Sequence, residues 1–352
     1  MRYLVIGSGA VGGYLGGRLA LSGQPVLFLA RPPQAEALRR SGLTLVEGGQ
    51  AARLAEMKLE SDLSSACSAF DPQVILIAVK AYALEAVIES LHRLPAPIPP
   101  LVCLLNGIGN EQRLSEAFGA GQVIAAALTT AVQVPSPGTV RVEKLRGLGL
   151  HSGHSLAPEL LAELAAAGVN PRLVADAASL KWSKLLTNLV SNATSAILHW
   201  TPAQVYAHPG LYRLEVEALR ETVRLMRGKG IPAVNLPGVP TAWFARLVGW
   251  PPGLSRPILL RAVTSGRGDK LPSLVYDLER RRSEVEWLNG AVAQHAQASG
   301  MAAPANRLLC NLLLALVGGA EDPQAYRGQP QRLLARAAAA GVPGVTGYNP
   351  AG

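Results

Sequence analysis

The sequence has little cysteine. Three of its 352 residues are cysteines: Cys67, Cys103 and Cys310. Three cysteines at irregular spacing are too few for a disulfide framework and do not match the spacing of a zinc site. We therefore expect no metal ion, and we interpret Cys103, which lies in an apolar stretch, as a core residue.

Long hydrophobic runs are also lacking. The apolar run from Leu312 to Val317 is far shorter than the roughly 20 residues that a membrane span requires. The N-terminus places Arg2 ahead of apolar residues, as a secretory signal does, but glycines interrupt that stretch. We therefore expect a soluble, cytoplasmic protein with no membrane partner.

The sequence has fewer acidic residues (24) than basic residues (33), and its formal net charge is +9. Such a balance is compatible with nucleic-acid binding, but the basic residues are scattered. The triplet Arg280-Arg-Arg282 is flanked by Glu279 and Glu284, which is typical of a solvated helix face. We expect no nucleic-acid partner, and the charge favours an anionic cofactor and substrate through long-range attraction.

The length of 352 residues indicates two domains. Up to about residue 150, apolar strands alternate with helical stretches, which predicts an α/β domain with a doubly wound parallel sheet. From Asp176 onward helical periods replace the strand signal. The predicted domains are 1–175 (Rossmann), 176–340 (all-helical) and a disordered tail, 341–352.

The beginning of the chain predicts a dinucleotide site. An apolar strand, Tyr3 to Ile6, leads into Gly7-Ser-Gly-Ala-Val-Gly12 and then into a helical stretch. In this pattern the first glycine permits a tight turn, the second admits a pyrophosphate, and the third lets the helix approach the strand. The helix N-terminus favours the phosphates. The cofactor-binding residues predicted here are Gly7, Ser8, Gly9, Ala10, Val11 and Gly12.

The end of the second strand indicates which dinucleotide binds. An NAD site would have an acidic residue there, whereas this chain has Arg31, and its first acidic residue is Glu36. A guanidinium favours a phosphate on the ribose, so we predict NADP(H). The alternative is a surface arginine without a role.

Polar residues also follow two further predicted strands. Lys80 follows the strand Val74 to Val79, and Asn106 follows the strand Leu101 to Leu105. Ligands of open α/β sheets bind outside the carboxyl ends of strands. We therefore predict that Lys80 contacts cofactor phosphate and that Asn106 contacts the nicotinamide or the substrate, the alternative being ordinary loop polarity.

A stripe of three polar residues lies in the predicted helical segment Leu180 to Leu198. Lys184, Asn188 and Asn192 recur every four residues, opposite an apolar side. The stripe faces a cleft in one interpretation and forms an interhelical hydrogen-bond network in the other. The chain has seven lysines against twenty-six arginines, so an amine at Lys184 favours a site where a proton is released, which arginine cannot do.

A second long helix is predicted from Ser273 to Ser299, with Ser273, Asp277 and Glu284 on one face. Between the two helices, residues 231–272 are rich in proline and glycine and predict a connection with short helical pieces.

Together these motifs resemble the ketopantoate reductase (2-dehydropantoate 2-reductase) family over roughly residues 1–318. The resemblance depends on the order and spacing of several short motifs. They are Gly7-Ser-Gly-Ala-Val-Gly12, Ala30-Arg31, Val79-Lys80-Ala81, Leu105-Asn-Gly-Ile-Gly109, Lys181-Trp-Ser-Lys-Leu-Leu-Thr-Asn188 with Asn192, Pro272-Ser273, Ser283-Glu-Val-Glu-Trp-Leu-Asn-Gly290, and Gly300-Met-Ala-Ala-Pro304 with Asn306.

The resemblance implies a Rossmann domain, an all-α C-terminal domain of the 6-phosphogluconate dehydrogenase type and reduction of a 2-oxo acid by NADPH in a cleft. Lys184 would be the general acid, and Asn106, Asn188 and Asn192 would place it and the substrate. Ser273 would bind the substrate carboxylate, and Glu284 would bind the distal hydroxyl and contact the cofactor site. Arg31 and Lys80 would hold the adenosine phosphate side of NADPH.

Some features of the chain differ from the family pattern. Ser283-Glu-Val-Glu286 replaces the usual Thr-Glu-Ile-Asp, and residues 232–270 form a longer stretch that carries Trp243 and Trp250. On one straight helix, Ser273 and Glu284 would be about 16 Å apart, too far for one small substrate. Either the chain folds back between the two residues, or only one of them contacts the substrate. In the second case Glu284 makes the contact and Ser273 is a helix cap.

The leading hypothesis is therefore an NADPH-dependent 2-dehydropantoate 2-reductase of pantothenate and coenzyme A biosynthesis. A paralogous reductase of another 2-oxo acid and a non-catalytic regulator that senses NADP(H) are the alternatives, with a nucleic-acid binder third. If the chain associates, we expect a homodimer.

Overall fold

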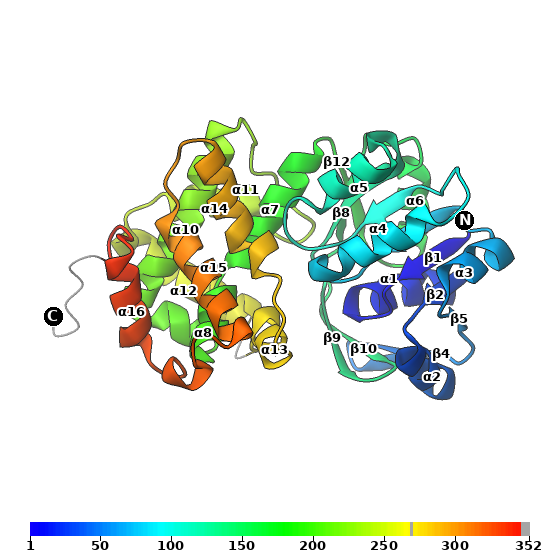
Figure 1. Ribbon diagram of the computed structural model, residues 1–352, viewed down its shortest axis with the longest axis horizontal. Coiled ribbons are helices and arrows are strands. Elements are labelled where there is room, and N and C mark those ends of the chain that lie inside the picture. Colours follow the sequence, from blue (N-terminus) through cyan, green and yellow to red (C-terminus); the bar gives the residue numbers. More distant parts are fainter. Residues whose placement is uncertain (268–269, 346–352) are drawn as a thin grey trace. The chain divides into compact units, whose positions relative to one another are not determined.

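The computed structural model describes residues 1–267 and 270–345, and the chain forms two compact units. Unit 1 comprises Met1–Leu105, Gly109–Lys181 and Leu236–Val239, and unit 2 comprises Asn106–Ile108, Trp182–Asn235 and the chain from Pro240 onward. The strands belong to the chain coloured blue to green in Figure 1, and the chain coloured yellow to red is helical.

The main sheet of unit 1 has eight strands. These are β1 (Tyr3–Ile6), β2 (Val26–Leu29), β5 (Lys58–Glu60), β6 (Val74–Ile77), β7 (Leu101–Cys103), β8 (Val123–Leu128), β11 (Leu148–His151) and β12 (Pro171–Val174). Their spatial order is β12-β11-β8-β7-β6-β1-β2-β5, and neighbours are parallel except β8 and β11. The predicted doubly wound α/β fold is therefore confirmed, and one antiparallel pair interrupts it.

Helices connect the strands of the main sheet, so its central strands are covered on both faces. All four residues of β1 are buried, as are all four of β6. The helical elements of unit 1 are α1 (Ala10–Leu21), α2 (Pro32–Ser41), α3 (Leu63–Phe70), η1 (Ala81–Ala83), α4 (Leu84–His92), α5 (Asn110–Phe118), η2 (Ala120–Gln122) and α6 (Ala157–Ala166).

Unit 1 also contains a second sheet, which the sequence reasoning did not anticipate. Its strands, in spatial order, are β4 (Gln50–Leu54), β3 (Leu43–Glu47), β10 (Thr139–Lys144) and β9 (Ala131–Ser136). Helix α1 packs between the two sheets. A side chain at Gly16 would meet the Phe28 ring of β2 at 2.6 Å, and one at Gly17 would meet Leu43 of β3 at 2.8 Å. Glycines on two faces of α1 therefore allow both contacts.

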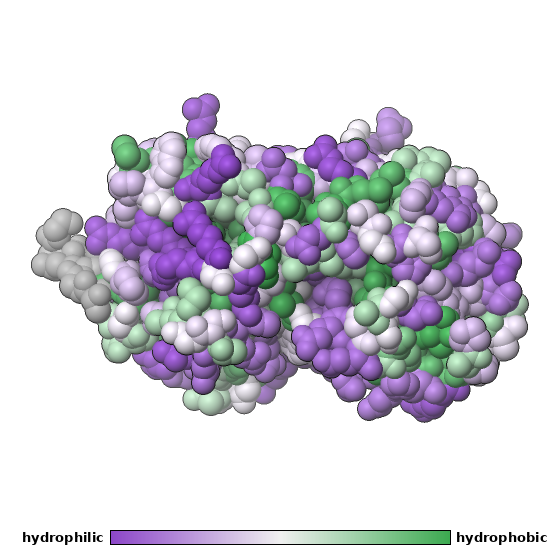
Figure 2. Space-filling model, turned by 90° about the horizontal axis from the view of Figure 1, so that it is seen from above, coloured by the Kyte–Doolittle hydropathy of each residue, from purple (hydrophilic) through white to green (hydrophobic). Residues whose placement is uncertain are grey.

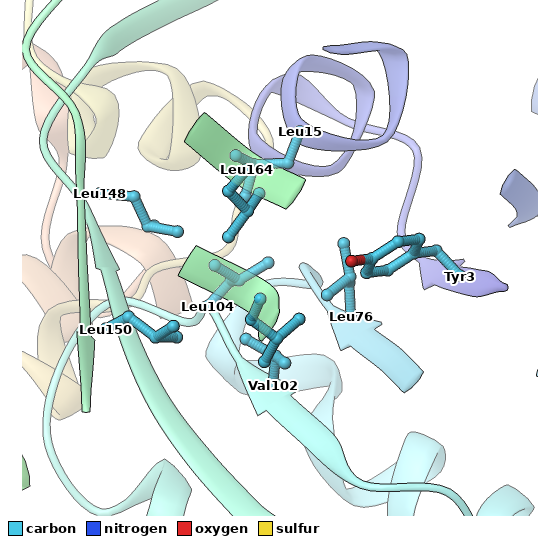
Figure 3. Close-up of a pocket in the computed structure, with 9 residues that line it drawn as sticks. Tyr3, Leu15, Leu76, Val102, Leu104, Leu148, Leu150 and Leu164 are labelled. Atoms are coloured by element: carbon cyan, nitrogen blue, oxygen red, sulfur yellow. The ribbon is translucent and has the colours of Figure 1, made fainter. Parts of the chain in front are cut away.

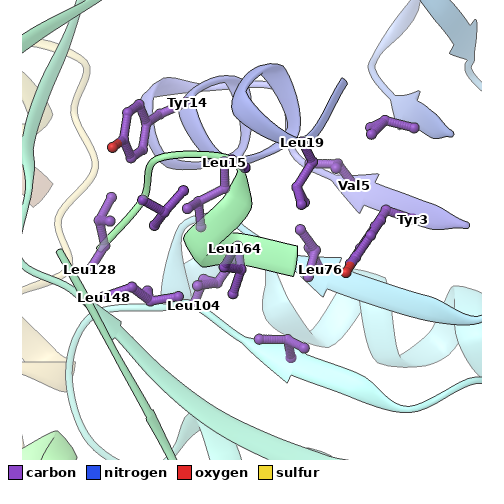
Figure 4. Close-up of a cluster of buried hydrophobic side chains, with 14 of the residues drawn as sticks. Tyr3, Val5, Tyr14, Leu15, Leu19, Leu76, Leu104, Leu128, Leu148 and Leu164 are labelled. Carbon is purple, nitrogen blue, oxygen red and sulfur yellow. The ribbon is translucent and has the colours of Figure 1, made fainter. Parts of the chain in front are cut away.

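The core of unit 1 lies where α1 and α6 meet the main sheet. Tyr3 and Val5 of β1 pack there with Leu15 and Leu19 of α1 and Leu164 of α6 (Figure 4). A cavity of about 10 Å³ remains among apolar side chains that include Tyr3, Leu15 and Leu164 (Figure 3). A space of this size without polar partners stays dry. The cavity is therefore a packing defect and not a ligand site.

A short segment from late in the chain completes unit 1. Residues Leu236–Val239 pair with themselves through an isolated bridge and belong to this unit. The hydroxyl of buried Thr129 contacts the carbonyl oxygens of Gly147 at 2.9 Å and Pro237 at 2.8 Å. The predicted boundary at residue 175 is therefore incomplete for unit 1, because the prediction placed these residues in the second domain.

Among the described residues of unit 2, all regular secondary structure is helical. Its elements are α7 (Ala177–Leu189), whose first five residues belong to unit 1, α8 (Asn192–Leu198), α9 (Pro202–Ala207), α10 (Pro209–Gly228), α11 (Thr241–Val248), α12 (Pro252–Arg267), α13 (Ser273–Glu279), η3 (Val285–Trp287), α14 (Asn289–Ala298), α15 (Pro304–Gly318), η4 (Pro323–Ala325) and α16 (Pro330–Ala339).

The sequence predicts two long helices in this unit, and both predictions are wrong because each segment is divided into shorter helices. The segment Leu180 to Leu198 divides into α7 and α8, because Ser191 adopts a left-handed conformation with φ 55°. The segment Ser273 to Ser299 divides into α13, η3 and α14, with Arg281 at φ 52° between the first two. The connection 231–272 contains the 16-residue helix α12, longer than the short pieces that were predicted.

Buried carboxylates of α10 explain how two of these helices begin. Glu215 accepts the backbone N–H of Ser191 at 2.7 Å and the hydroxyl of Thr194. Glu221 accepts the backbone N–H groups of Ala305 at 2.8 Å and Asn306 at 2.9 Å, as well as the Asn306 amide at 2.7 Å. Backbone N–H groups at the N-termini of α8 and α15 have no partner within their own helix. They are thus bound by carboxyl groups of a neighbouring helix and not by N-cap side chains.

The surface is mixed in character, and the visible face in Figure 2 carries hydrophobic and hydrophilic residues side by side. Among the described helices, none combines the length and apolar character needed to cross a membrane.

Cys103 is buried, as predicted for a core residue. Val342 and Val345 are buried too, so the prediction of a disordered tail is wrong for residues 341–345, and residues 346–352 lie outside the described chain.

The buried Glu221 carboxyl makes the stability of the protein depend on pH. Burial raises its pKa from 4.5 to about 7, although the donors of Asn306 and Ala305 partly oppose this. Because the folded-state pKa is raised, the stability that this group contributes is fully present below about pH 4.5 and is lost as pH rises through about 7. We expect the free energy of unfolding of the native protein, relative to Glu221→Gln, to fall by about 3 kcal/mol over this range.

Urea unfolding of both proteins at several pH values between about 4.5 and 8 measures this difference. A difference that stays constant with pH would mean that Glu221 is ionised throughout.

Candidate active site

The glycine loop of unit 1 has the close backbone approaches that its sequence predicts. Gly7 directly follows β1 and has φ 101°, and a side chain there would lie 2.9 Å from the backbone of Ala78. A side chain at Gly12 would overlap the carbonyl oxygen of Gly7. The loop therefore turns tightly between the carboxyl ends of β1 and β6, where the order of strands reverses.

The outer side of this loop is open and suits a phosphate. A side chain at Gly9 would meet no atom within 4 Å. The buried hydroxyl of Ser8 has no hydrogen-bond partner among the described residues, and the first turn of α1, which begins with Ala10 and Val11, carries no acidic residue. An open cradle, an unpaired buried hydroxyl and a helix N-terminus fit the pyrophosphate of a dinucleotide.

Two basic residues begin elements at the same edge of the sheet. Arg31 is the N-cap residue of α2, which follows β2, and Lys80 is the N-cap residue of η1, which follows β6. The strands β2 and β6 flank β1. The structure thus brings Arg31, Lys80 and the glycine loop to one edge of unit 1.

A side-chain hydrogen bond in unit 2 joins two of the predicted amides. The Asn188 amide donates to Oδ1 of Asn106 at 3.0 Å. Lys184 lies one helical turn before Asn188 on α7, so the two side chains share a face of the helix. Lys184 is half-buried. The structure therefore groups Lys184, Asn188 and Asn106.

The loop that carries Asn106 docks on the short helix that Glu284 begins. Ile108 donates its backbone N–H to the carbonyl oxygen of Trp287 at 3.0 Å. Gly107 has φ 88°, and a side chain there would meet the Trp287 carbonyl at 2.5 Å. Glu284 is the N-cap residue of η3 and is 3 % exposed. This docking places the Glu284 turn next to the Asn106 loop.

Asn192 contacts the start of α13, the helix that Ser273 begins. Oδ1 of Asn192, the first residue of α8, accepts the backbone N–H of Leu274 at 3.1 Å. Ser273 is the first residue of α13 and is exposed, and the N-cap position belongs to Pro272. The interpretation of Ser273 as a helix cap is therefore wrong.

The structure also corrects the predicted stripe and the predicted distance problem. Asn192 starts a new helix, so it does not continue the face of α7 that Lys184 and Asn188 share. Ser273 and Glu284 lie in separate elements joined by a left-handed turn at Arg281. The spacing calculated for one straight helix therefore does not apply to them.

Sequence reasoning missed two groups that support these sites. The Gln34 amide of α2 donates to the carbonyl oxygen of Ser8 at 3.2 Å and holds the glycine loop. The Trp287 carbonyl holds the Asn106 loop. Neither contact has a sequence signal, because each involves a backbone carbonyl that any residue would offer.

Comparison with known protein families gives two matches that together cover most of the chain. Residues 3–150 match the model described as "Ketopantoate reductase PanE/ApbA". Residues 176–317 match the model of the C-terminal part of the same family.

Curated relatives are similar over nearly their full length. The 2-dehydropantoate 2-reductase of Pyrococcus horikoshii is 25 % identical over 90 % of this chain and 97 % of its own. The 2-dehydropantoate 2-reductase of Archaeoglobus fulgidus is 28 % identical over 90 % of this chain and 98 % of its own.

Solved structures agree with the fold. A PanE/ApbA family ketopantoate reductase from Ralstonia eutropha JMP134 has a TM-score of 0.76 at 26 % identity, covering 91 % of this chain and 99 % of its own. A D-mandelate dehydrogenase with NADH and anilino(oxo)acetate has a TM-score of 0.74 at 19 % identity, covering 91 % and 99 %. The second likeness concerns the fold alone.

A pair of alanine substitutions in the glycine loop separates folding from cofactor binding. We expect Gly12→Ala to lower the free energy of unfolding by about 1–3 kcal/mol, because the new methyl group overlaps the Gly7 carbonyl. Gly9→Ala should leave stability unchanged, since its methyl group enters open space, and should weaken dinucleotide binding about tenfold or more by blocking phosphate. Urea unfolding and fluorescence titration with NADPH measure the two effects.

Equal NADPH affinity in the native protein and in Gly9→Ala would contradict the assignment of this loop to the phosphates.

Proposed function

Because the chain belongs to the ketopantoate reductase family, we propose that this oxidoreductase is an NADPH-dependent 2-dehydropantoate 2-reductase that forms pantoate for pantothenate and coenzyme A biosynthesis. The observation that carries the proposal is the hydrogen bond between Asn188 and Asn106, one helical turn from Lys184. It supports a site in which neutral amides hold a substrate beside a single amine.

The cofactor preference is proposed from unit 1. Arg31 would bind the 2′-phosphate of NADPH, and Lys80 would bind phosphate at the same edge of the sheet. The pyrophosphate would lie on the glycine loop, with the hydroxyl of Ser8 as a donor. When bound, NADPH supplies the hydride that attacks the carbonyl carbon of the substrate.

The proton would come from Lys184. As the hydride arrives, negative charge builds on the carbonyl oxygen of the substrate, and an ammonium within hydrogen-bond reach stabilises that charge and transfers its proton. Asn106 and Asn188 are uncharged, so they orient the substrate without neutralising the ammonium. Lys184 regains a proton from water after the product leaves.

Substrate selection would depend on Glu284, Asn192 and Ser273. Glu284 is 3 % exposed, and its side chain would accept a hydrogen bond from the distal hydroxyl of the substrate. Ser273 begins α13, next in sequence to Leu274, whose backbone N–H binds Asn192, and its hydroxyl would donate to the carboxylate of the substrate.

A reductase of another 2-oxo acid is the second candidate. Within the segment 232–270, residues Thr241–Val248 form α11 and residues Pro252–Arg267 form α12, with Trp243 47 % exposed and Trp250 46 % exposed. Such added helices in unit 2 can alter the choice of substrate. A panel of 2-oxo acids separates this candidate from the first, and binding of NADPH without turnover of any acid would identify a sensor of NADP(H).

The role of Lys184 is tested by replacing it. We expect the native protein to oxidise NADPH when 2-dehydropantoate is added, and Lys184→Ala to lower kcat about 10²-fold or more. Lys184→Arg should be similarly impaired, because a guanidinium keeps the charge and does not release its proton. The loss of absorbance of NADPH measures turnover, and Lys229→Ala, which removes an exposed amine elsewhere in unit 2, is the control.

Turnover of Lys184→Ala at the native rate would overturn the proton-donor role. Full activity of Lys184→Arg would reduce that role to electrostatic stabilisation.

The preference for NADPH is tested at Arg31. We expect Arg31→Ala to raise KM for NADPH roughly 10- to 100-fold, which corresponds to the loss of a charge-assisted hydrogen bond, and to leave KM for NADH nearly unchanged. Arg40→Ala removes the same charge from the same helix, where Arg40 pairs with Glu36, and should change neither value. Equal effects of Arg31→Ala on both cofactors would contradict recognition of the 2′-phosphate.

A further inference from the structure

A buried ammonium lies at the edge of unit 1. Lys181 is 4 % exposed, and its Nζ donates to the carbonyl oxygens of Leu105 at 2.5 Å and Ala126 at 3.3 Å. It also pairs with Oε1 of Glu111 at 2.7 Å. The ammonium thus makes two hydrogen bonds to backbone carbonyl oxygens and one ion pair with a carboxylate.

The charge of this group is maintained by its surroundings. Burial is the largest single influence and would lower the pKa of Lys181, but Glu111 and Cys103 together more than offset it, and the pKa is raised. Lys181 is therefore an ammonium throughout the physiological range. A buried ion pair of this kind stabilises little by itself, since desolvation offsets the attraction. Its presence calls for an explanation other than stability.

The position of Lys181 in the chain suggests that explanation. Leu105 and Lys181 are both the last residues of unit 1 before the chain passes into unit 2. One hydrogen bond from Lys181 to the Leu105 carbonyl ties these two crossing points together. The next residue after Leu105 is Asn106, and Lys184 follows Lys181 by one turn of the same helix.

We propose that Lys181 is a positioning residue, whose ammonium fixes the Leu105 carbonyl against α7 so that Asn106 and Lys184 keep a constant register. This role rests on the proposed function of Lys184 as proton donor. The Asn188–Asn106 hydrogen bond of 3.0 Å forms only if the Asn106 backbone stays at the same level along α7. A small shift of that register is enough to lower the rate of a reaction that depends on alignment.

The competing explanation is that Lys181 only balances the charge of Glu111. The two explanations differ in what the double variant Lys181→Met/Glu111→Gln should do. Replacing both charged groups by neutral side chains of similar size removes the desolvation problem, and such exchanges are often neutral for stability. The bond to the Leu105 carbonyl is nevertheless lost.

The kinetic experiment compares Lys181→Met, Glu111→Gln and the double variant with the native protein, using NADPH and 2-dehydropantoate. We expect the double variant to unfold at nearly the native urea concentration and to have a kcat lowered about tenfold or more. Its KM for NADPH should stay within about twofold of the native value, because the glycine loop and Arg31 are untouched. Glu111→Gln keeps the Lys181 amine, which can still donate to the Leu105 carbonyl whether or not it is charged, and should retain most of kcat. A double variant with native kcat would overturn the proposal.

A second measurement does not depend on turnover. Hydrogen exchange followed by mass spectrometry should show the peptide that contains residues 104–110 exchanging about tenfold faster in the double variant than in Glu111→Gln. A peptide from α10 serves as the control and should not change. If no 2-oxo acid is reduced by the native protein, the proposed function fails, and the exchange rates still decide the role of Lys181. Equal exchange of residues 104–110 in the two variants would overturn it.

Discussion

The close packing of α1 between two sheets is the constraint on which unit 1 depends. On one side, Gly12 and Gly16 let the helix reach the backbone of the glycine loop and the Phe28 ring of β2. On another side, Gly17 lets it reach Leu43 of the second sheet. The same approach fixes the start of α1 at the reversal of strand order, the position proposed for the phosphates of the cofactor. The packing of the core and the geometry of the cofactor site therefore have one cause.

Much of unit 1 could be predicted because its signals are local. The strand Tyr3–Ile6 has the predicted bounds, and the strands at Val74 and Leu101 begin where the apolar runs begin. The second sheet was missed because β4 is exposed along most of its length and because β3 and β10 are separated by nearly a hundred residues along the chain. Pairing of β3 with β10 is a long-range contact that periodicity does not record.

In unit 2, less of the structure could be predicted from local signals. The positions of helical residues could be predicted, but the breaks within them could not. Ser191 and Arg281 are neither glycine nor asparagine, so nothing in the sequence marks their left-handed conformations. The break at Ser191 is stabilised by the Glu215 carboxylate from another helix. The grouping of Lys184, Asn188 and Asn106 had a signal in the four-residue spacing and at the strand end, whereas the meeting of Asn192 with the start of α13 had none.

The small segment Leu236–Val239 limits how far the two units are separable. It comes after more than fifty residues of unit 2, yet it supplies the Pro237 carbonyl to the buried Thr129 hydroxyl and packs close to Gly147. A gene fragment that ended after β12 would encode every strand of unit 1. It would still lack the segment Leu236–Val239, which contacts the Thr129 hydroxyl. In evolutionary terms, this half of the molecule is not a module that recombination can transplant by a single cut.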